Sequence, residues 1–239
     1  MESKMFLRSG LEKLNISYDE EVIDNLLKYK NLLLEWNKKI NLTTITQDEE
    51  IFIKHFFDSA TCLKTERVKN DSKVIDVGTG AGFPGIVLKI LKKEIDITLL
   101  DSLKKRTLYL EDLVSKLDLK STDIIHGRAE ELANKKEYRE KYHIALSRAV
   151  ASLNVLLEYC LPFVEVGGYF LCQKGPKYES ELKESEKALE VLGGKVLDIK
   201  EYLLPNSDIK HYILIVEKVF KTPVKYPRKP GKPSLNPII

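Results

Sequence analysis

The twelve residues that decide the fold are Val74-Ile75-Asp76-Val77-Gly78-Thr79-Gly80-Ala81-Gly82-Phe83-Pro84-Gly85. A short hydrophobic run with an acidic residue comes first, four glycines follow, and the chain continues into the mainly apolar run Ile86 to Leu91. Glycine is required where a chain turns with positive φ and where backbone approaches a ligand too closely for a Cβ atom. The stretch therefore predicts a strand, a tight loop and the start of a helix that hold a nucleotide.

The spacing of the glycines helps to distinguish two kinds of nucleotide site. A dinucleotide-binding loop has the pattern G-x-G-x-x-G. Here the glycines are Gly78, Gly80 and Gly82, and Phe83 stands three positions after Gly80. The stretch instead resembles the acidic-x-G-x-G-x-G motif of class I methyltransferases, which implies S-adenosylmethionine as the cofactor. On the loop alone, a generic nucleotide site remains an alternative.

Length and composition set the class of protein. A chain of 239 residues, 43% hydrophobic and 31% charged, is typical of one sizeable globular α/β domain with a small extension. No apolar run reaches the roughly 18 residues of a membrane span, and the first ten residues are too charged for a signal peptide, so we expect a cytoplasmic protein. Cys62, Cys160 and Cys172 lack metal-ligand spacing, which predicts buried free thiols and no metal site.

The first 70 residues predict a helical cap. Val22, Leu26, Tyr29, Leu33, Trp36 and Ile40 recur at spacings of four and three, as on one face of a long helix that begins near Asp19. A short helix near residues 6–14 and a second pattern over residues 48–64 complete the cap. We therefore predict a helical cap over 1–70, a catalytic domain over 71–220 and a separate tail over 221–239.

From residue 73 onward, strand and helix patterns alternate, which is typical of a mostly parallel sheet covered on both faces. The expected strands are 74–77, 95–100, 122–126, 144–147 and 168–173, with helices after residue 83 and over 102–117, 152–161 and 178–192. The last two strands, 195–204 and 211–219, are joined only by a turn and must form a hairpin. A seven-stranded sheet that ends with one antiparallel strand resembles the Rossmann-like fold of class I methyltransferases.

Ligands of such sheets bind at the carboxyl ends of the strands. The first strand leads to Gly78. The second ends at Asp101, which lies 23 residues later and suits a contact to a ribose hydroxyl, although an Asp here could also cap the next helix. The third leads to Ala129 and Glu130, where we expect the adenine; the alternative for Glu130 is an ordinary acidic residue in the first turn of a helix.

The fourth strand ends in Ser147-Arg148-Ala149, where methyltransferases keep their reaction-specific residues. Arg148 could hold the cofactor carboxylate or a nucleic-acid phosphate, or form a structural salt bridge. No catalytic residue is assigned, with Arg148 the one candidate. The sequence has no evident base or nucleophile at these positions, which suits an acceptor with no proton to lose, such as N7 of guanine, for which catalysis reduces to alignment.

Positive charge is concentrated near the end of the chain. Residues 219–239 hold five basic residues and no acidic ones, so the rest of the chain sums to 3 − 5 = −2. The tail also holds five of the nine prolines, which favours an extended arm over a helix. From composition, the tail is either a solvated strap or an arm that contacts phosphates.

Five segments together resemble the bacterial RsmG family, formerly called glucose-inhibited division protein B. They are Trp36-Asn37-Lys38-Lys39-Ile40-Asn41-Leu42-Thr43, His55-Phe56-Phe57-Asp58-Ser59, the stretch 76–85, Ser147-Arg148-Ala149 and Tyr226-Pro227-Arg228-Lys229-Pro230-Gly231-Lys232-Pro233. The resemblance implies methylation of guanine N7 in a loop of 16S rRNA near the decoding site, with S-adenosylmethionine as donor. It also implies that Gly78, Phe83, Ala129, Glu130 and Arg148 contact the cofactor, with Asp101 carried over less securely.

The resemblance also favours contacts to RNA. The candidates in the resembling segments are Lys38, Lys39, His55, Arg228, Lys229 and Lys232. Lys174, at the end of the fifth strand, is a weaker candidate of the same kind as Arg148. His55 and Asp58 are three positions apart and share a helix face, so they either face the substrate or form a buried pair. We expect a monomer that acts on 16S rRNA or the small ribosomal subunit. The alternatives are a methyltransferase of a small molecule or protein, and a ribosome-binding module without activity.

Overall fold

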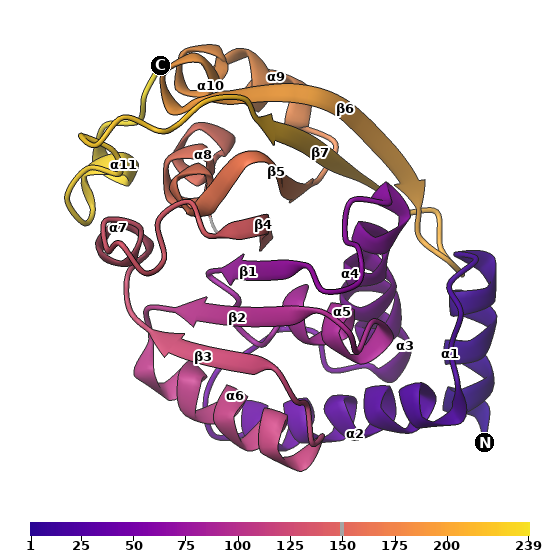
Figure 1. The fold of residues 1–239 in the computed structure, drawn as a ribbon. Helices are drawn as coiled ribbons and strands as arrows, with labels where there is room; N and C mark the ends of the chain where they lie inside the picture. Colours follow the sequence, from indigo (N-terminus) through magenta and orange to yellow (C-terminus); the bar gives the residue numbers. More distant parts are fainter. Residues whose placement is uncertain (149–150) are drawn as a thin grey trace.

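A seven-stranded sheet runs through the centre of the molecule (Figure 1). The computed structural model describes residues 1–148 and 151–239; Ala149 of the motif Ser147-Arg148-Ala149 lies outside the described residues. The strand order is β3-β2-β1-β4-β5-β7-β6. The strands are β1 (Lys73–Val77), β2 (Asp96–Asp101), β3 (Thr122–His126), β4 (Tyr142–Arg148), β5 (Val164–Lys174), β6 (Gly194–Leu203) and β7 (Lys210–Lys218).

The pairing of the strands confirms the predicted topology. Strands β1 to β5 pair in parallel, while β7 runs antiparallel to both β5 and β6. The hairpin predicted for the last two strands is therefore present. From β1 the chain first adds strands on one side of the sheet and then, from β4 onward, on the other side. Such a switch between neighbouring strands opens a crevice at their carboxyl ends.

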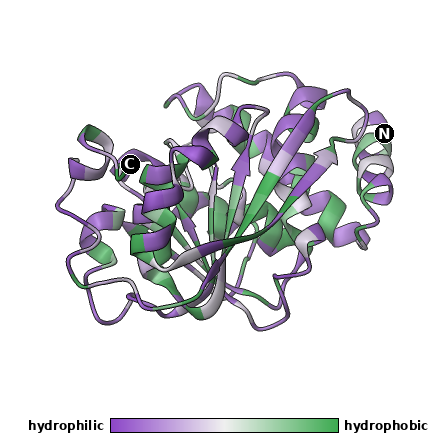
Figure 2. Cartoon of the chain, turned by 90° about the horizontal axis from the view of Figure 1, so that it is seen from above, coloured by the Kyte–Doolittle hydropathy of each residue, from purple (hydrophilic) through white to green (hydrophobic). Residues whose placement is uncertain are grey.

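Helices cover both faces of the sheet. They are α1 (Glu2–Lys13), α2 (Glu20–Asn37), α3 (Asp48–Ile51), α4 (Asp58–Ala60), α5 (Gly85–Leu91), α6 (Lys104–Lys116), α7 (Ala129–Leu132), α8 (Leu153–Cys160), α9 (Tyr178–Lys183), α10 (Glu186–Leu192) and α11 (Lys232–Leu235). Successive residues of a strand point to opposite faces. Val74 thus packs in one core with α2, α5 and α6, whereas Ile75 packs in the other with α8 and α10. Hydrophobic residues follow the central strands, and much of the outside is hydrophilic (Figure 2).

The long helix α2 ties the N-terminal segment to the glycine loop. It begins after Asp19, whose carboxylate accepts from the backbone N–H of Val22 at 2.8 Å. Within the helix, Tyr29 is fully buried, and its hydroxyl donates to the carbonyl of Ala81 at 2.7 Å. The helix ends at Asn37, so the apolar stripe expected to reach Ile40 extends beyond it.

Two expected helices are interrupted. The pattern over residues 48–64 is confirmed as helical, but it contains a π-helical segment at Phe52–Phe57 and a 3-10 segment at Thr61–Thr65. The helix expected over 178–192 is divided into α9 and α10, and the buried Ser185 hydroxyl donates to the carbonyl of Glu181 where they meet. Within the residues that the structure describes, no helix combines the length and apolar character needed to cross a membrane.

Candidate functional site

The glycine loop connects β1 to α5 and has the predicted backbone conformation. The φ angles of Gly78, Gly80 and Gly82 are 72°, 61° and 97°, a region that L side chains rarely adopt. A Cβ atom on Gly82 would also lie 2.8 Å from the Tyr29 hydroxyl. Position 82 thus requires glycine for two reasons.

Asp76 supports the loop from beneath. Its Oδ2 accepts from the Thr79 hydroxyl at 2.7 Å and from the backbone N–H of Gly85 at 2.8 Å. The side chain is fully buried, which raises its pKa to about 6. Asp76 Oδ1 has no hydrogen-bond partner among residues 1–148 and 151–239. Asp76, the acidic residue of the motif, therefore fixes the conformation of the loop, because its carboxylate bonds Thr79 within the loop and Gly85 at the end of the loop.

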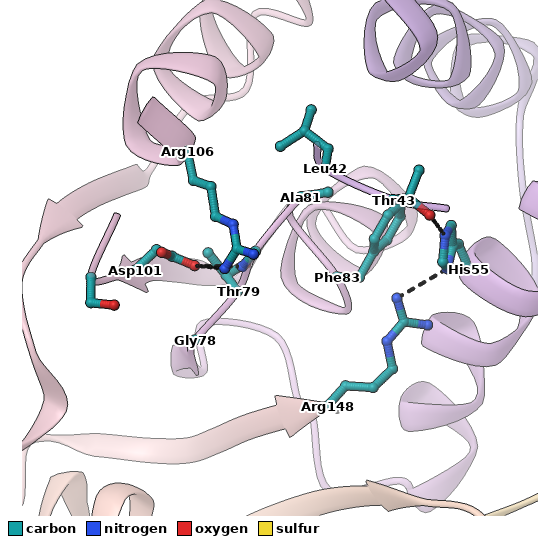
Figure 3. A pocket seen from close by; sticks show the side chains of 12 residues that line it. Leu42, Thr43, His55, Gly78, Thr79, Ala81, Phe83, Asp101, Arg106 and Arg148 are labelled. Atoms are coloured by element: carbon teal, nitrogen blue, oxygen red, sulfur yellow. Dashed lines mark hydrogen bonds and ion pairs between the residues drawn. The ribbon is translucent and has the colours of Figure 1, made fainter. Parts of the chain in front are cut away.

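Asp101 lies opposite the loop at the end of β2. Its Oδ2 accepts from the backbone N–H of Gly80 at 2.9 Å, and Arg106 approaches the same oxygen at 3.3 Å (Figure 3). Its Oδ1 accepts from the backbone N–H of Leu103, directly before α6. Asp101 therefore fixes both the loop and the segment that leads into α6, but it does not cap that helix, because Leu103 is the N-cap residue.

Two adjoining hollows follow the carboxyl edge of the sheet. The first, of about 420 Å³, is lined by the glycine loop and by side chains that include Phe83, Asp101 and Arg148 (Figure 3). The second, of about 210 Å³, shares Gly78 and Asp101 with the first. It is also lined by Ala129 and Glu130. The structure thus brings together all six residues that were predicted to contact the cofactor.

The C-terminal tail forms one wall of the second hollow, which Ser234 and Tyr159 line side by side. Their hydroxyls lie 2.8 Å apart. The backbone N–H of Gly231 donates to Oε1 of the buried Glu130 at 2.9 Å. The tail thus packs beside α7 and α8 (Figure 1), and Glu130 holds it in place.

Arg148 joins the end of β4 to the π-helical segment. Its guanidinium donates to Asp58 Oδ2 at 2.7 Å and to the carbonyl of Lys54 at 3.0 Å, and it lies over the Phe83 ring at 4.9 Å. Asp58 is buried, and His211 and Arg148 hold its pKa below the ordinary value against the opposing effect of burial. The salt bridge given as an alternative for Arg148 is therefore present.

His55 lies between Arg148 and the glycine loop. Its ring stacks on Phe83 with centroids 4.5 Å apart, and its Nε2 lies 2.9 Å from the Thr43 hydroxyl (Figure 3). Burial, followed by the charge of Arg148, lowers the pKa of His55 to about 4. His55 is therefore neutral at pH 7. π-Helical turns often occur at functional sites. Arg148 contacts both His55 in this π-helical segment and Asp58, the residue directly after it.

A third hollow, of about 720 Å³, shares His55 and Arg148 with the first. Its lining includes Gln173, Lys174 and Glu181. The Lys174 ammonium donates to Glu181 Oε2 at 2.7 Å and to the carbonyl of Ala151 at 2.8 Å. This hollow opens next to the expected position of the cofactor and has room for a second ligand.

The other residues proposed to contact RNA differ in their exposure. Lys38, Lys39, Lys229 and Lys232 are exposed. Arg228 is held within the fold, because its guanidinium bonds Glu158 at 2.6 to 3.1 Å and its side chain is only 17% exposed. The three cysteines are buried free thiols, as predicted. The described residues contain no cluster of His, Cys, Asp or Glu suited to a metal ion.

Sequence reasoning missed Gln173 and His211. His211 Nδ1 lies 2.6 Å from Asp58 Oδ1, and Gln173 Nε2 donates to the carbonyl of Asp58 at 2.8 Å. Both residues reach Asp58 from strands more than a hundred positions further along the chain, so no local pattern reveals them. Arg106, in the first turn of α6, could have been found as a basic residue five positions after Asp101.

The sheet order, the glycine loop and the adjoining hollows define a class I methyltransferase, whose cofactor is S-adenosylmethionine. A SAM-dependent methyltransferase from Aquifex aeolicus has the same fold, with a TM-score of 0.54 and 19% identity over 78% of this chain and 98% of that chain. The YcgJ protein from Bacillus subtilis also has a TM-score of 0.54, at 12% identity over 70% of this chain and 100% of that one.

The family follows from sequence similarity. The model of the GidB family, described as rRNA small subunit methyltransferase G, matches residues 22–209. The protein named ribosomal RNA small subunit methyltransferase G from Alkaliphilus metalliredigens is 53% identical over 238 residues, which cover 100% of both chains. The protein of that name from Acetivibrio thermocellus is 52% identical over 98% of this chain and 96% of its own. The chain belongs to this family.

Proposed function

We propose that the protein transfers the methyl group of S-adenosylmethionine to N7 of one guanine in a loop of 16S rRNA near the decoding site. Family membership supports the rRNA of the small subunit as substrate. The glycine loop and the two adjoining hollows would hold the cofactor, with Gly78, Phe83, Asp101 and Arg148 around it. The cofactor supplies an electrophilic methyl group on sulfur.

The observation that carries the proposal is the state of the titratable groups beside Arg148. Asp58 is held as a carboxylate by Arg148 and His211, and the pKa of His55 is lowered to about 4. Neither group is suited to remove a proton near pH 7. This fits an acceptor such as guanine N7, whose lone pair attacks directly, so that catalysis depends on the alignment of the nucleophile with methyl and sulfur.

The target base would enter through the third hollow. That hollow meets the cofactor hollow at His55 and Arg148, so an acceptor placed there would lie next to the cofactor that the first hollow would hold. Base chemistry of this kind requires an unstacked or flipped nucleotide. We also propose that the protein acts in the cytoplasm, where its family's substrate is found, and as a monomer, since residues of one chain line all three hollows.

The experiment is methyl transfer from labelled S-adenosylmethionine to small subunits and to 16S rRNA that lack the modification. We expect label in one guanine, which then becomes cleavable by borohydride reduction and aniline, as is characteristic of N7-methylguanine. Label in another base, or transfer to protein alone, would contradict the proposal. Binding should also weaken steeply as salt rises if RNA is the substrate.

A further inference from the structure

The third hollow contains a donor and an acceptor held side by side, which the cofactor site does not explain. Lys174, at the end of β5, and Glu181, on α9, are joined by the 2.7 Å bond between Nζ and Oε2. Glu181 Oε2 also accepts from the backbone N–H of Leu153 at 2.7 Å, so this carboxylate is held at two points. Its other oxygen, Oε1, has no hydrogen-bond partner in the described part of the chain.

Both side chains retain bonding capacity toward the hollow. An ammonium has three N–H donors, of which Lys174 uses two in bonds to the residues that the structure describes. The Glu181 side chain is 28% exposed and the Lys174 side chain 10%, so the pair is partly accessible while its position is fixed. Among residues 1–148 and 151–239, the pair thus leaves one N–H donor of Lys174 without a partner beside a carboxylate oxygen whose lone pairs are unused.

We propose that Glu181 and Lys174 read the Watson–Crick edge of the target guanine. Guanine has the acceptor O6 next to the donor N1–H, followed by the N2 amino donor. Lys174 would donate to O6 while Glu181 accepts from N1–H and from the N2 amino group. This inference rests on the proposed function, because it assumes that a guanine enters the third hollow.

The same pair discriminates against adenine. Once N7 points toward the methyl group, the order of groups along the edge of a purine is set. Adenine then presents its N6 amino donor where guanine has O6, and the acceptor N1 where guanine has N1–H. Lys174 would face a donor and Glu181 an acceptor. Buried polar groups left unpaired in this way reject the wrong ligand strongly.

Other residues of the hollow fit a planar base. Gln173 is 3% exposed, and its Oε1 is a buried acceptor without a hydrogen-bond partner among the residues described. Ile45 and Ile209 supply apolar surface in the same lining. Ligand pockets commonly combine apolar walls with a few convergent polar groups. Gln173 thus forms part of the wall of the hollow, and its bond to the carbonyl of Asp58 fixes its position.

The Glu181 contact would strengthen during the reaction. Methylation at N7 gives the purine ring a positive charge, which makes N1–H and the N2 amino group better donors. An interaction that is stronger in the transition state than in the ground state raises kcat, not only affinity. Glu181 would therefore act as a specificity-determining residue whose loss lowers kcat as well as raising KM for RNA.

The first test compares Glu181→Gln with Glu184→Gln, an exposed glutamate just past the same helix. We expect Glu181→Gln to lower kcat/KM for RNA by about 10-fold to 100-fold, the loss typical of one good base contact. Its calorimetric Kd for S-adenosylmethionine should stay within about twofold of the parent value, which also shows that it folds. Glu184→Gln should match the parent protein. Equal kcat/KM for both variants would overturn the proposal.

The second test uses RNA in which inosine, which lacks the N2 amino group, replaces the target guanine. The parent protein should methylate inosine RNA about tenfold less efficiently, and this penalty should shrink to less than about threefold in Glu181→Gln. A parent protein that shows no inosine penalty would overturn the proposal without any variant. RNA with 7-deazaguanine tests the proposed function separately: methylation of that RNA would exclude N7 as acceptor, whatever Glu181 does.

Discussion

The guanidinium of Arg228 lies 2.6 Å from the carboxylate of Glu158, and Glu158 is buried on α8. Arg228 also donates its backbone N–H to Glu158 Oε1 at 2.7 Å. A basic residue in a proline-rich tail therefore pairs within the fold and fixes where the tail turns toward α7. The nearby Lys229 is exposed.

Replacing Arg228 with methionine should destabilise the protein. The change would leave the Glu158 carboxylate buried without its partner, which typically costs about 3–5 kcal/mol. Urea denaturation measures the free energy of unfolding. Lys229→Met is the matched control and should change it by less than about 0.5 kcal/mol. Equal stability of the two variants would show that the buried pair contributes nothing.

Removing residues 231–239 should weaken cofactor binding while the Arg228 pair stays intact. The deletion removes the Gly231 N–H bond to Glu130 and the Ser234 wall of the second hollow. Loss of about one hydrogen bond predicts a roughly fivefold higher Kd for S-adenosylmethionine by calorimetry. An unaltered cofactor Kd with strongly reduced RNA affinity would instead favour a tail that acts only on RNA.

Gly82→Ala should be more harmful than Gly80→Ala. Both positions have positive φ, so alanine costs about 1–2 kcal/mol at each. At Gly82 the new methyl group would also meet Tyr29 and Ile86 at 2.8 Å, whereas at Gly80 the nearest atom outside the adjoining residues is 3.9 Å away. Overpacking typically adds about 1–3 kcal/mol. Thermal unfolding of the two variants checks this order, and equal losses would contradict it.

The protonation of His55 gives a prediction for acidic pH. Its pKa is lowered to about 4 in the fold, against an ordinary value of 6.5. Between these two pH values the His55 side chain binds a proton in the unfolded chain but not in the folded protein. The stability that neutral His55 contributes is therefore complete above pH 6.5 and is lost as the pH falls toward 4. The imidazole C–H resonance of His55 should titrate near pH 4.

His55→Gln should reduce the loss of stability between pH 6.5 and pH 4, measured by denaturation at each pH. The parent protein, measured over the same pH range, is the reference for this slope. Asp76 works in the opposite direction, because its raised pKa of about 6 favours the folded state at acidic pH. The stability of the parent protein therefore also changes with pH, and the effect of His55 is the difference in pH dependence between His55→Gln and the parent. A His55 resonance that titrates near pH 6.5 would contradict the account.

The fold and the cofactor side of the site were predictable because their signals are local. The glycine loop, the alternation of strands and helices, and the final hairpin each occupy a short window of sequence. Gly78 and Asp101 lie at strand ends, and the topology of a doubly wound sheet brings such ends together. These predictions needed no knowledge of side-chain contacts.

The acceptor side was less predictable because it depends on distant partners. Asp58 receives Arg148, Gln173 and His211 from three different strands. The charge of the tail suggested RNA for Arg228, but the buried Glu158 determines its position, and nothing in the sequence near Glu158 marks it as a partner. Composition shows where charge occurs, while burial decides whether that charge is available to a ligand.

The most direct test of the central claim is transfer of a labelled methyl group to 16S rRNA that lacks the modification, followed by mapping of the labelled base. The account predicts label at N7 of one guanine, and none when 7-deazaguanine replaces that guanine. Label that persists on 7-deazaguanine RNA, or cofactor binding without any transfer to RNA, would contradict it.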